Sequence, residues 1–143
     1  MKAIDGSSIV HVLGYAINGF AERDPKFRDA VLEEFNPRGI DFLRSAATSC
    51  TGDSILMWGF TNTRQLTRTG ESLSELVERK PIFKETLLRQ NQGKHPLKGP
   101  AMIASSPHDD LIPHQQVRAV AGAYCQMGGT VDFMAAPGTA TIP

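Results

Sequence analysis

The sequence contains few cysteines, since only Cys50 and Cys125 occur among its 143 residues. Two cysteines so far apart exclude a fold built on disulfides and do not match the ligand spacing of a zinc site. Two interpretations stay open, which are a single bridge between them in an oxidising compartment and two buried free thiols. We expect buried free thiols, because free cysteine is among the most frequently buried residue types.

An excess of charge of one sign and long apolar runs are also absent. Lysine plus arginine count 15 and aspartate plus glutamate count 15, so the chain has no field of one sign that would attract nucleic acid. No apolar segment approaches the roughly 20 residues that span a bilayer, and the amino terminus lacks the pattern of a signal peptide. We therefore expect no nucleic-acid partner, no transmembrane segment and no export signal in this chain, and the localisation stays open.

Two motifs of catalytic sites are missing as well. The sequence has no Gly-x-Ser-x-Gly pentapeptide, which forms the strained turn that presents a nucleophilic serine between a strand and a helix. It has no glycine-rich phosphate loop either. Some serines follow or lie near glycine, and we interpret them as helix caps or turn residues, namely Ser7, Ser8 and Ser54.

The first part of the chain, up to residue 90, predicts a series of short helices. Apolar residues recur there at helical spacing, and cap and proline signals separate the stretches. These signals are Ser7 or Ser8, Asp24-Pro25, Asn36-Pro37 and Pro81, and the apolar residues Leu73, Leu76 and Val77 mark one further helix. The continuous apolar run 55–60 predicts burial, either as a strand or as a helical turn. Residues 61–70 are polar and predict irregular structure.

The second part predicts a strand, a loop, a helix and a second strand. Residues 100–105 are small and apolar and predict a buried strand, and helical spacing then runs from Pro113 to a stop at Gly128. Residues 131–135 alternate as a strand. A crossover of this length favours two parallel strands. Because two strands leave sheet edges and faces unpaired, we expect the chain to be part of something larger.

The loop after the first strand is acidic and is the first place to look for a site. It contains His108, Asp109 and Asp110 and is followed by His114. In parallel sheets the chemistry lies at the carboxyl ends of the strands, where this loop falls. Adjacent loop carboxylates are most often solvated or cap the next helix. The four side chains have the types that could hold a metal, but their spacing matches no known ligand pattern.

Several segments carry a resemblance to a known family. The segment Ser-Pro-His-Asp-Asp-Leu-Ile-Pro at 106–113 precedes a helix that ends in Tyr124-Cys125 before a glycine-rich turn. Upstream lie Asn36-Pro37-Arg38-Gly39, Cys50 and the stretch 60–66. The downstream part resembles the carboxyl-terminal part of the secretory lipases of the α/β-hydrolase fold. The upstream part is similar to the helical cap region that this family inserts before its last core strands.

The resemblance implies a fold, an activity and one site residue. The fold class is α/β, a partial α/β-hydrolase fold with a helical cap-like segment over residues 1–92 and a core portion over residues 93–143. The implied activity is hydrolysis of acylglycerols or other carboxylic esters without a cofactor. The matching acid of a Ser-Asp-His triad is Asp109, four residues before Pro113, with Asp110 as its neighbour. Such an acid orients the histidine that takes the serine proton.

The other two members of that triad are missing from the sequence. The nucleophile would lie upstream of Met1, in the chain order serine, acid, histidine. The histidine should follow the last strand, but that stretch has Thr139 and Thr141, and threonine takes no proton near neutral pH. His108 and His114 have no nucleophile beside them, so we do not expect either to replace it. The chain alone is therefore expected to be catalytically incomplete.

Three hypotheses for function follow. In the first, the chain is a lipase fragment whose partner is the missing amino-terminal half. In the second, it is a non-catalytic module that binds an acyl chain or a partner helix on the apolar faces of stretches 9–20 and 73–88. In the third, it is a truncated gene product without a function of its own, which would be poorly soluble or molten because its sheet partners are absent.

Overall fold

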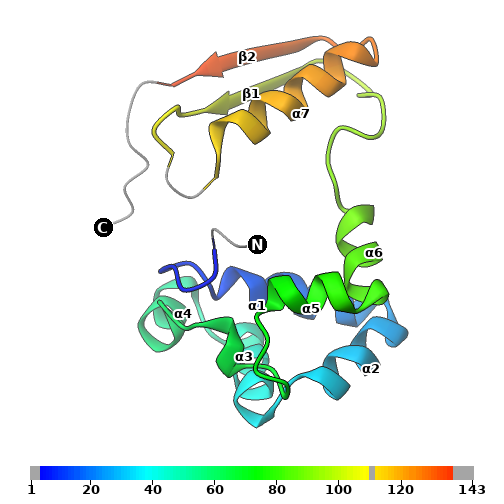
Figure 1. Ribbon diagram of the computed structural model, residues 1–143. Coiled ribbons are helices and arrows are strands. Elements are labelled where there is room, and N and C mark those ends of the chain that lie inside the picture. The colour runs from blue at the N-terminus through cyan, green and yellow to red at the C-terminus, as the bar shows by residue number, and fades with distance from the viewer. Residues whose placement is uncertain (1–3, 110–111, 137–143) are drawn as a thin grey trace. The chain divides into compact units, whose positions relative to one another are not determined.

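The computed structural model describes residues 4–109 and 112–136, and it contains two compact units, Met1–Arg89 and Gln90–Pro143. Figure 1 shows their elements. The first unit is helical, with α1 (Val12–Arg23), α2 (Pro25–Glu34), α3 (Pro37–Thr48), α4 (Thr51–Trp58), the 3-10 helix η1 (Thr63–Gln65), α5 (Leu73–Arg79) and α6 (Pro81–Arg89). The second is an α/β unit, with β1 (Ala101–Ser105), α7 (His114–Gln126) and β2 (Val131–Ala135).

Asp24 and Asn36 begin α2 and α3 as predicted. The Asp24 carboxylate accepts hydrogen bonds from two backbone N–H groups in the first turn of α2. The side-chain oxygen of Asn36 accepts one from the Gly39 N–H at 2.9 Å. A proline occupies the first turn of both helices, where its missing N–H is not needed. In contrast, α1 begins at Val12, without a side-chain cap, and not directly after Ser7 or Ser8.

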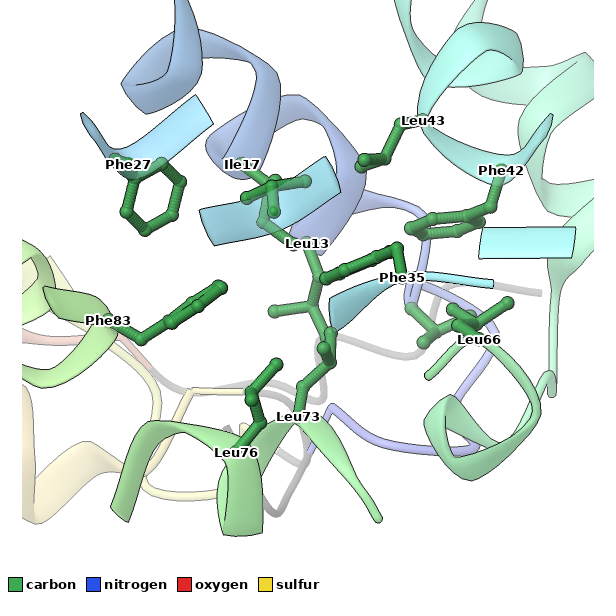
Figure 2. Packing of buried hydrophobic residues seen from close by; sticks show 12 residues of the cluster. Leu13, Ile17, Phe27, Phe35, Phe42, Leu43, Leu66, Leu73, Leu76 and Phe83 are labelled. Atoms are coloured by element: carbon green, nitrogen blue, oxygen red, sulfur yellow. The ribbon is translucent and has the colours of Figure 1, made fainter. Parts of the chain in front are cut away.

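One apolar cluster forms the core of the helical unit, and Figure 2 shows how its side chains converge from several helices. It includes the fully buried Leu66 from the stretch 61–70. This stretch is less irregular than predicted, because it also contains η1. An isolated antiparallel bridge joins Phe35 to Thr67. The start of α3 approaches this stretch so closely that a Cβ added at Gly39 would lie 2.2 Å from the Leu66 carbonyl oxygen.

The run 55–60 is helical up to Trp58 and largely exposed, so its predicted burial is wrong. Leu56 is 87% exposed and Phe60 is 74% exposed. Consecutive residues on a helix point to different sides, and α4 packs against the core on one side only. Trp58 lies on that side, with its ring edge-on to Phe42 at 5.3 Å between centroids.

An ionic cluster joins α2 to the joint between α5 and α6. The side chain of Glu34 is only 7% exposed and lies 2.5 Å from the Arg79 guanidinium and 2.6 Å from Lys80 Nζ. Arg79 also pairs with Glu71. Burial raises the pKa of Glu34, but the hydrogen bonds from Lys80 and Arg79 outweigh it and lower the pKa below its usual value. The hydrogen bond from Arg79 likewise lowers the pKa of Glu71. Both carboxylates are therefore ionised at neutral pH.

The α/β unit confirms the predicted parallel pairing. Ala101 pairs with Val131 and Ser105 with Ala135, and α7 packs against both strands (Figure 1). The predicted burial of β1 is wrong, since its residues alternate between more and less exposed and Met102 is 71% exposed. A strand presents alternate side chains to opposite faces, and α7 covers one face of this sheet.

Both cysteines are free and exposed, so the predicted burial of their thiols is wrong and no bridge joins them. Cys50 is the residue that precedes the first turn of α4. Cys125 lies in the last turn of α7, where the helical spacing of Val117, Val120, Ala121 and Tyr124 defines another side of the helix as the packed one. Burial of a cysteine is decided by its place relative to the packed side of the neighbouring elements, which composition does not reveal.

Candidate functional site

The loop after β1 holds Asp109 at the carboxyl end of the sheet, where the sequence pattern predicts it. The N–H of Ala136 donates a hydrogen bond to the Ser105 carbonyl at 3.0 Å, so the ends of β1 and β2 are held together at this point. The chain then turns polar for a few residues before α7 begins at His114. This geometry places an acidic side chain at the edge of the sheet where α/β proteins carry their chemistry.

Hydrogen bonds within the loop fix the position of Asp109. Its N–H donates to the Ser106 carbonyl at 3.2 Å, and the N–H of His108 donates to Ser106 Oγ at 3.2 Å. One carboxylate oxygen of Asp109, Oδ1, accepts from the Ile112 N–H at 2.9 Å. The side chain is half-buried. A carboxylate held in this way keeps one orientation, which suits an acid that must orient a histidine, although a purely structural loop aspartate makes the same bond.

The two nearby histidines differ in their surroundings. His108 is exposed in the loop. His114, the first residue of α7, is half-buried, with its ring 5.7 Å from that of Phe133 between centroids. Its Nδ1 is buried and makes no hydrogen bond within the part of the chain that the structure describes. Asp110 and the stretch 137–143, with Thr139 and Thr141, lie outside the described residues.

Sequence reasoning missed Ser105, the last residue of β1. Ser105 is 8% exposed, and its Oγ is buried without a hydrogen-bond partner among the described residues. The neighbouring Ser106 instead uses its hydroxyl within the loop. Adjacent serines look alike in a sequence, and only the strand register shows which of them turns inward. Together, Ser105, Asp109 and His114 make the carboxyl end of this sheet polar.

A second candidate site is an apolar pocket of about 60 Å³ in the helical unit. Residues of α1 and α2 form one wall and residues of α5 and α6 form the other, as Figure 2 shows for Leu13, Ile17, Phe27, Leu73 and Phe83. Every lining residue is apolar, and the complete set is Leu13, Ala16, Ile17, Phe20, Phe27, Leu73, Val77, Phe83 and Leu87. Such a surface suits a hydrocarbon chain and offers nothing to a polar ligand.

The described part of the chain contains neither a cluster of metal ligands nor a helix that could span a membrane. Within residues 4–109 and 112–136, no group of three histidine, cysteine, aspartate or glutamate side chains is placed to hold a metal ion. Among the helices in this described part, none combines the length and the apolar character needed to cross a membrane.

Comparison with known proteins gives matches over nearly the whole chain. The family model described as "Secretory lipase" matches residues 1–138. Lipase 6 of Candida albicans is 24% identical over 137 residues, which are 92% of this chain and 30% of that lipase. The chain thus spans about a third of the length of this relative.

Two solved structures of Candida antarctica lipase A have a similar fold. The structure of its closed state superposes with a TM-score of 0.79 at 15% sequence identity and covers 96% of this chain and 33% of lipase A. A second X-ray structure gives a TM-score of 0.75 at 16% identity with the same coverage. The helices and the small parallel two-stranded sheet of this chain are consistent with the predicted partial α/β fold.

Proposed function

Because this chain belongs to the secretory lipase family, we propose that it supplies the helical cap and the acid loop of a carboxylic ester hydrolase that acts on acylglycerols or other esters. Residues 1–92 are assigned to the cap and residues 93–143 to the core portion. The observation that carries the proposal is the placement of Asp109, half-buried at the carboxyl end of β1 with Oδ1 held by the Ile112 N–H at 2.9 Å.

In the proposed mechanism Asp109 acts on a histidine and not on the ester. Its carboxylate is the acceptor that we assign to the histidine Nδ1–H. The acid fixes the tautomer of the ring and stabilises the imidazolium that forms when the ring takes the serine proton. The serine oxygen then attacks the ester carbonyl, the alcohol leaves with that proton, and water hydrolyses the acyl-enzyme. This chain contributes the acid, and the serine and histidine come from outside it.

A chimera tests the proposal. Residues 1–136 replace the matching part of Candida albicans lipase 6. That lipase supplies the segments before and after this part. We expect this chimera to hydrolyse p-nitrophenyl butyrate, and we expect the isolated chain to show no turnover above the uncatalysed rate. A folded but inactive chimera would argue against the assignment. Turnover by the isolated chain that Asp109→Asn abolishes would contradict its catalytic incompleteness.

A second candidate function is non-catalytic binding of an acyl chain, which the apolar pocket of the helical unit favours. We expect the full chain to bind a fluorescent long-chain fatty acid saturably and without chemical change. Ala16 lines the pocket, so the larger side chain in Ala16→Phe should fill it. The affinity for the fatty acid should fall at least tenfold, because methylene groups of its chain can no longer be buried there. The matched control is Ala47→Phe, at an exposed alanine on α3. Absence of saturable binding to the unmodified chain would remove this candidate.

A further inference from the structure

We propose that the helical unit binds one internal water molecule between the side chains of His11 and Trp58, as a fixed part of its fold. Neither the ester hydrolysis nor the acyl-chain binding proposed above depends on this water. Its role is to join the segment before α1 to α4. Three observations point to it, which are three buried nitrogen atoms, the pairing of the two segments and the chemistry of the two rings.

His11 is buried without a polar partner among the described residues. Only 1% of its surface is exposed, and neither of its buried ring nitrogens, Nδ1 and Nε2, makes a hydrogen bond within this part of the chain. The buried indole Nε1 of Trp58 makes none there either. Leaving a buried polar group unpaired costs stability, so the large majority of such groups in native proteins are bonded to protein or to ordered water. These nitrogens therefore indicate a small polar ligand.

The chain around His11 runs antiparallel to α4 and the turn that follows it. About one helical turn before His11, the Ser7 carbonyl accepts a hydrogen bond from the Phe60 N–H at 2.9 Å. About one turn after His11, the Tyr15 hydroxyl donates to Ser54 Oγ at 3.1 Å. Residue numbers thus rise in one segment while they fall in the other. The two contacts bracket His11 and place it opposite the last turn of α4.

Helical spacing selects Trp58 as the residue of that turn that faces His11. Residues four positions apart on a helix lie on the same side, and Trp58 follows the fully buried Ser54 at this spacing. The residues between them face solvent, since Leu56 is 87% exposed and Met57 is 63% exposed. The buried indole nitrogen and the buried imidazole nitrogens are therefore inferred to lie in one place, between the segment before α1 and α4.

The hydrogen-bonding chemistry of the two rings selects water as the ligand. An indole N–H only donates, whereas a neutral imidazole has one nitrogen that donates and one that accepts. Water accepts from the Trp58 indole and donates to the accepting nitrogen of His11, so it links two groups of a kind that buried waters bridge. The donating nitrogen belongs to a ring that forms a T-shaped pair with Tyr15, with centroids 5.4 Å apart. This geometry lets a ring N–H meet an aromatic face.

The surrounding charges favour a neutral ligand over an ion. The Arg38 guanidinium lies over the face of the Trp58 ring, 5.6 Å from its centroid, whereas the indole N–H points along the ring plane. The Asp5 carboxylate is already an acceptor, since its Oδ1 accepts the Thr63 N–H at 2.8 Å. An ion buried without a countercharge costs far more than a neutral molecule. Water meets the needs of both rings without that cost.

The test observes the indole N–H of Trp58, which gives a single resonance because the chain has one tryptophan. In the isotope-labelled full chain, this proton should show a cross peak at the water frequency whose sign differs between NOESY and ROESY spectra. A water that stays bound while the protein tumbles gives that pattern, whereas surface water and direct hydrogen exchange do not. His11→Phe should remove the cross peak. It should also lower the equilibrium ratio of folded to unfolded chain about tenfold or more, because the indole N–H then stays buried without a partner.

The matched control is the double variant Tyr15→Phe/Ser54→Ala, which removes both hydroxyls that could relay a signal from solvent and should keep the cross peak. A cross peak that is absent from the unmodified chain, persists in His11→Phe or vanishes with the two hydroxyls overturns the proposal. Higher stability of His11→Phe also overturns it, since the imidazole then had no partner to lose. If His11→Phe does not fold, His11→Met replaces it, because methionine adapts to irregular space.

Discussion

Asp109→Asn is expected to lower the kcat of the lipase 6 chimera by about 10⁴-fold, the loss seen when the acid of a serine triad becomes an amide. The amide can still accept the Ile112 N–H through its oxygen, so the loop geometry should persist. What is lost is the negative charge that selects the histidine tautomer and stabilises the imidazolium. The measurement is kcat and KM for p-nitrophenyl butyrate, and KM should change far less than kcat because the substrate does not touch Asp109.

Two variants serve as controls for Asp109→Asn. Asp110→Asn changes the adjacent residue in the sequence, and Asp132→Asn changes an exposed carboxylate on β2. Both should keep kcat within a few-fold of the unmodified chimera. A loss of activity in Asp110→Asn equal to that in Asp109→Asn, or the full loss in Asp110→Asn alone, would show that the acid has been assigned to the wrong residue.

Gly39→Ala is expected to lower the free energy of unfolding of the helical unit by about 3 kcal/mol or more, at the upper end of what overpacking costs. The new Cβ would lie 2.2 Å from the Leu66 carbonyl oxygen and 2.7 Å from Phe35 Cδ1. The oxygen belongs to the backbone and cannot turn away, so α3 would have to withdraw from the loop. Urea denaturation monitored by circular dichroism measures the difference.

The matched control for this prediction is Gly52→Ala. Gly52 also lies in the first turn of a helix, α4, but a Cβ there would have no heavy atom within 4 Å. Alanine favours a helix over glycine by up to about 1 kcal/mol, so this variant should be neutral or slightly more stable. If both variants unfold at the same urea concentration, the close approach between α3 and Leu66 is not present in solution.

The sequence predicted those parts of the fold that depend on local signals. Asp24 and Asn36 predict the starts of α2 and α3, because a capping side chain binds backbone N–H groups only two or three positions away. The parallel pairing followed from the length of the crossover. Burial of a side chain could not be predicted in the same way, because it depends on which element of the folded chain packs against it. Leu56 and Met102 have apolar side chains, but α4 packs on one side and β1 has a helix on one face.

The candidate site was predicted only in part, because only some of its residues carry a signal in the local sequence. Asp109 could be found because the loop after a strand is visible in the sequence and because the segment 106–113 resembles a family motif. The buried Ser105 hydroxyl could not, since it depends on strand register. The ionic cluster around Glu34 could not be predicted either, because Glu34 and Arg79 are separated by 45 positions and each looks like an ordinary surface charge on its own helix.

The tie between the end of α2 and the stretch after η1 has a consequence for how the family can vary. Besides the bridge from Phe35 to Thr67, the Asn36 side chain donates to the carbonyls of Gln65 and Thr67, 31 positions away in the latter case. Residues 36–67 thus form a loop whose two ends are joined by these backbone and side-chain hydrogen bonds. Doubling the length of a closed loop costs only about 0.6 kcal/mol of entropy. Insertions at the largely exposed α4 should therefore change the stability of the core very little. Residues 36–67 are thus the place where we expect homologous chains to differ in length.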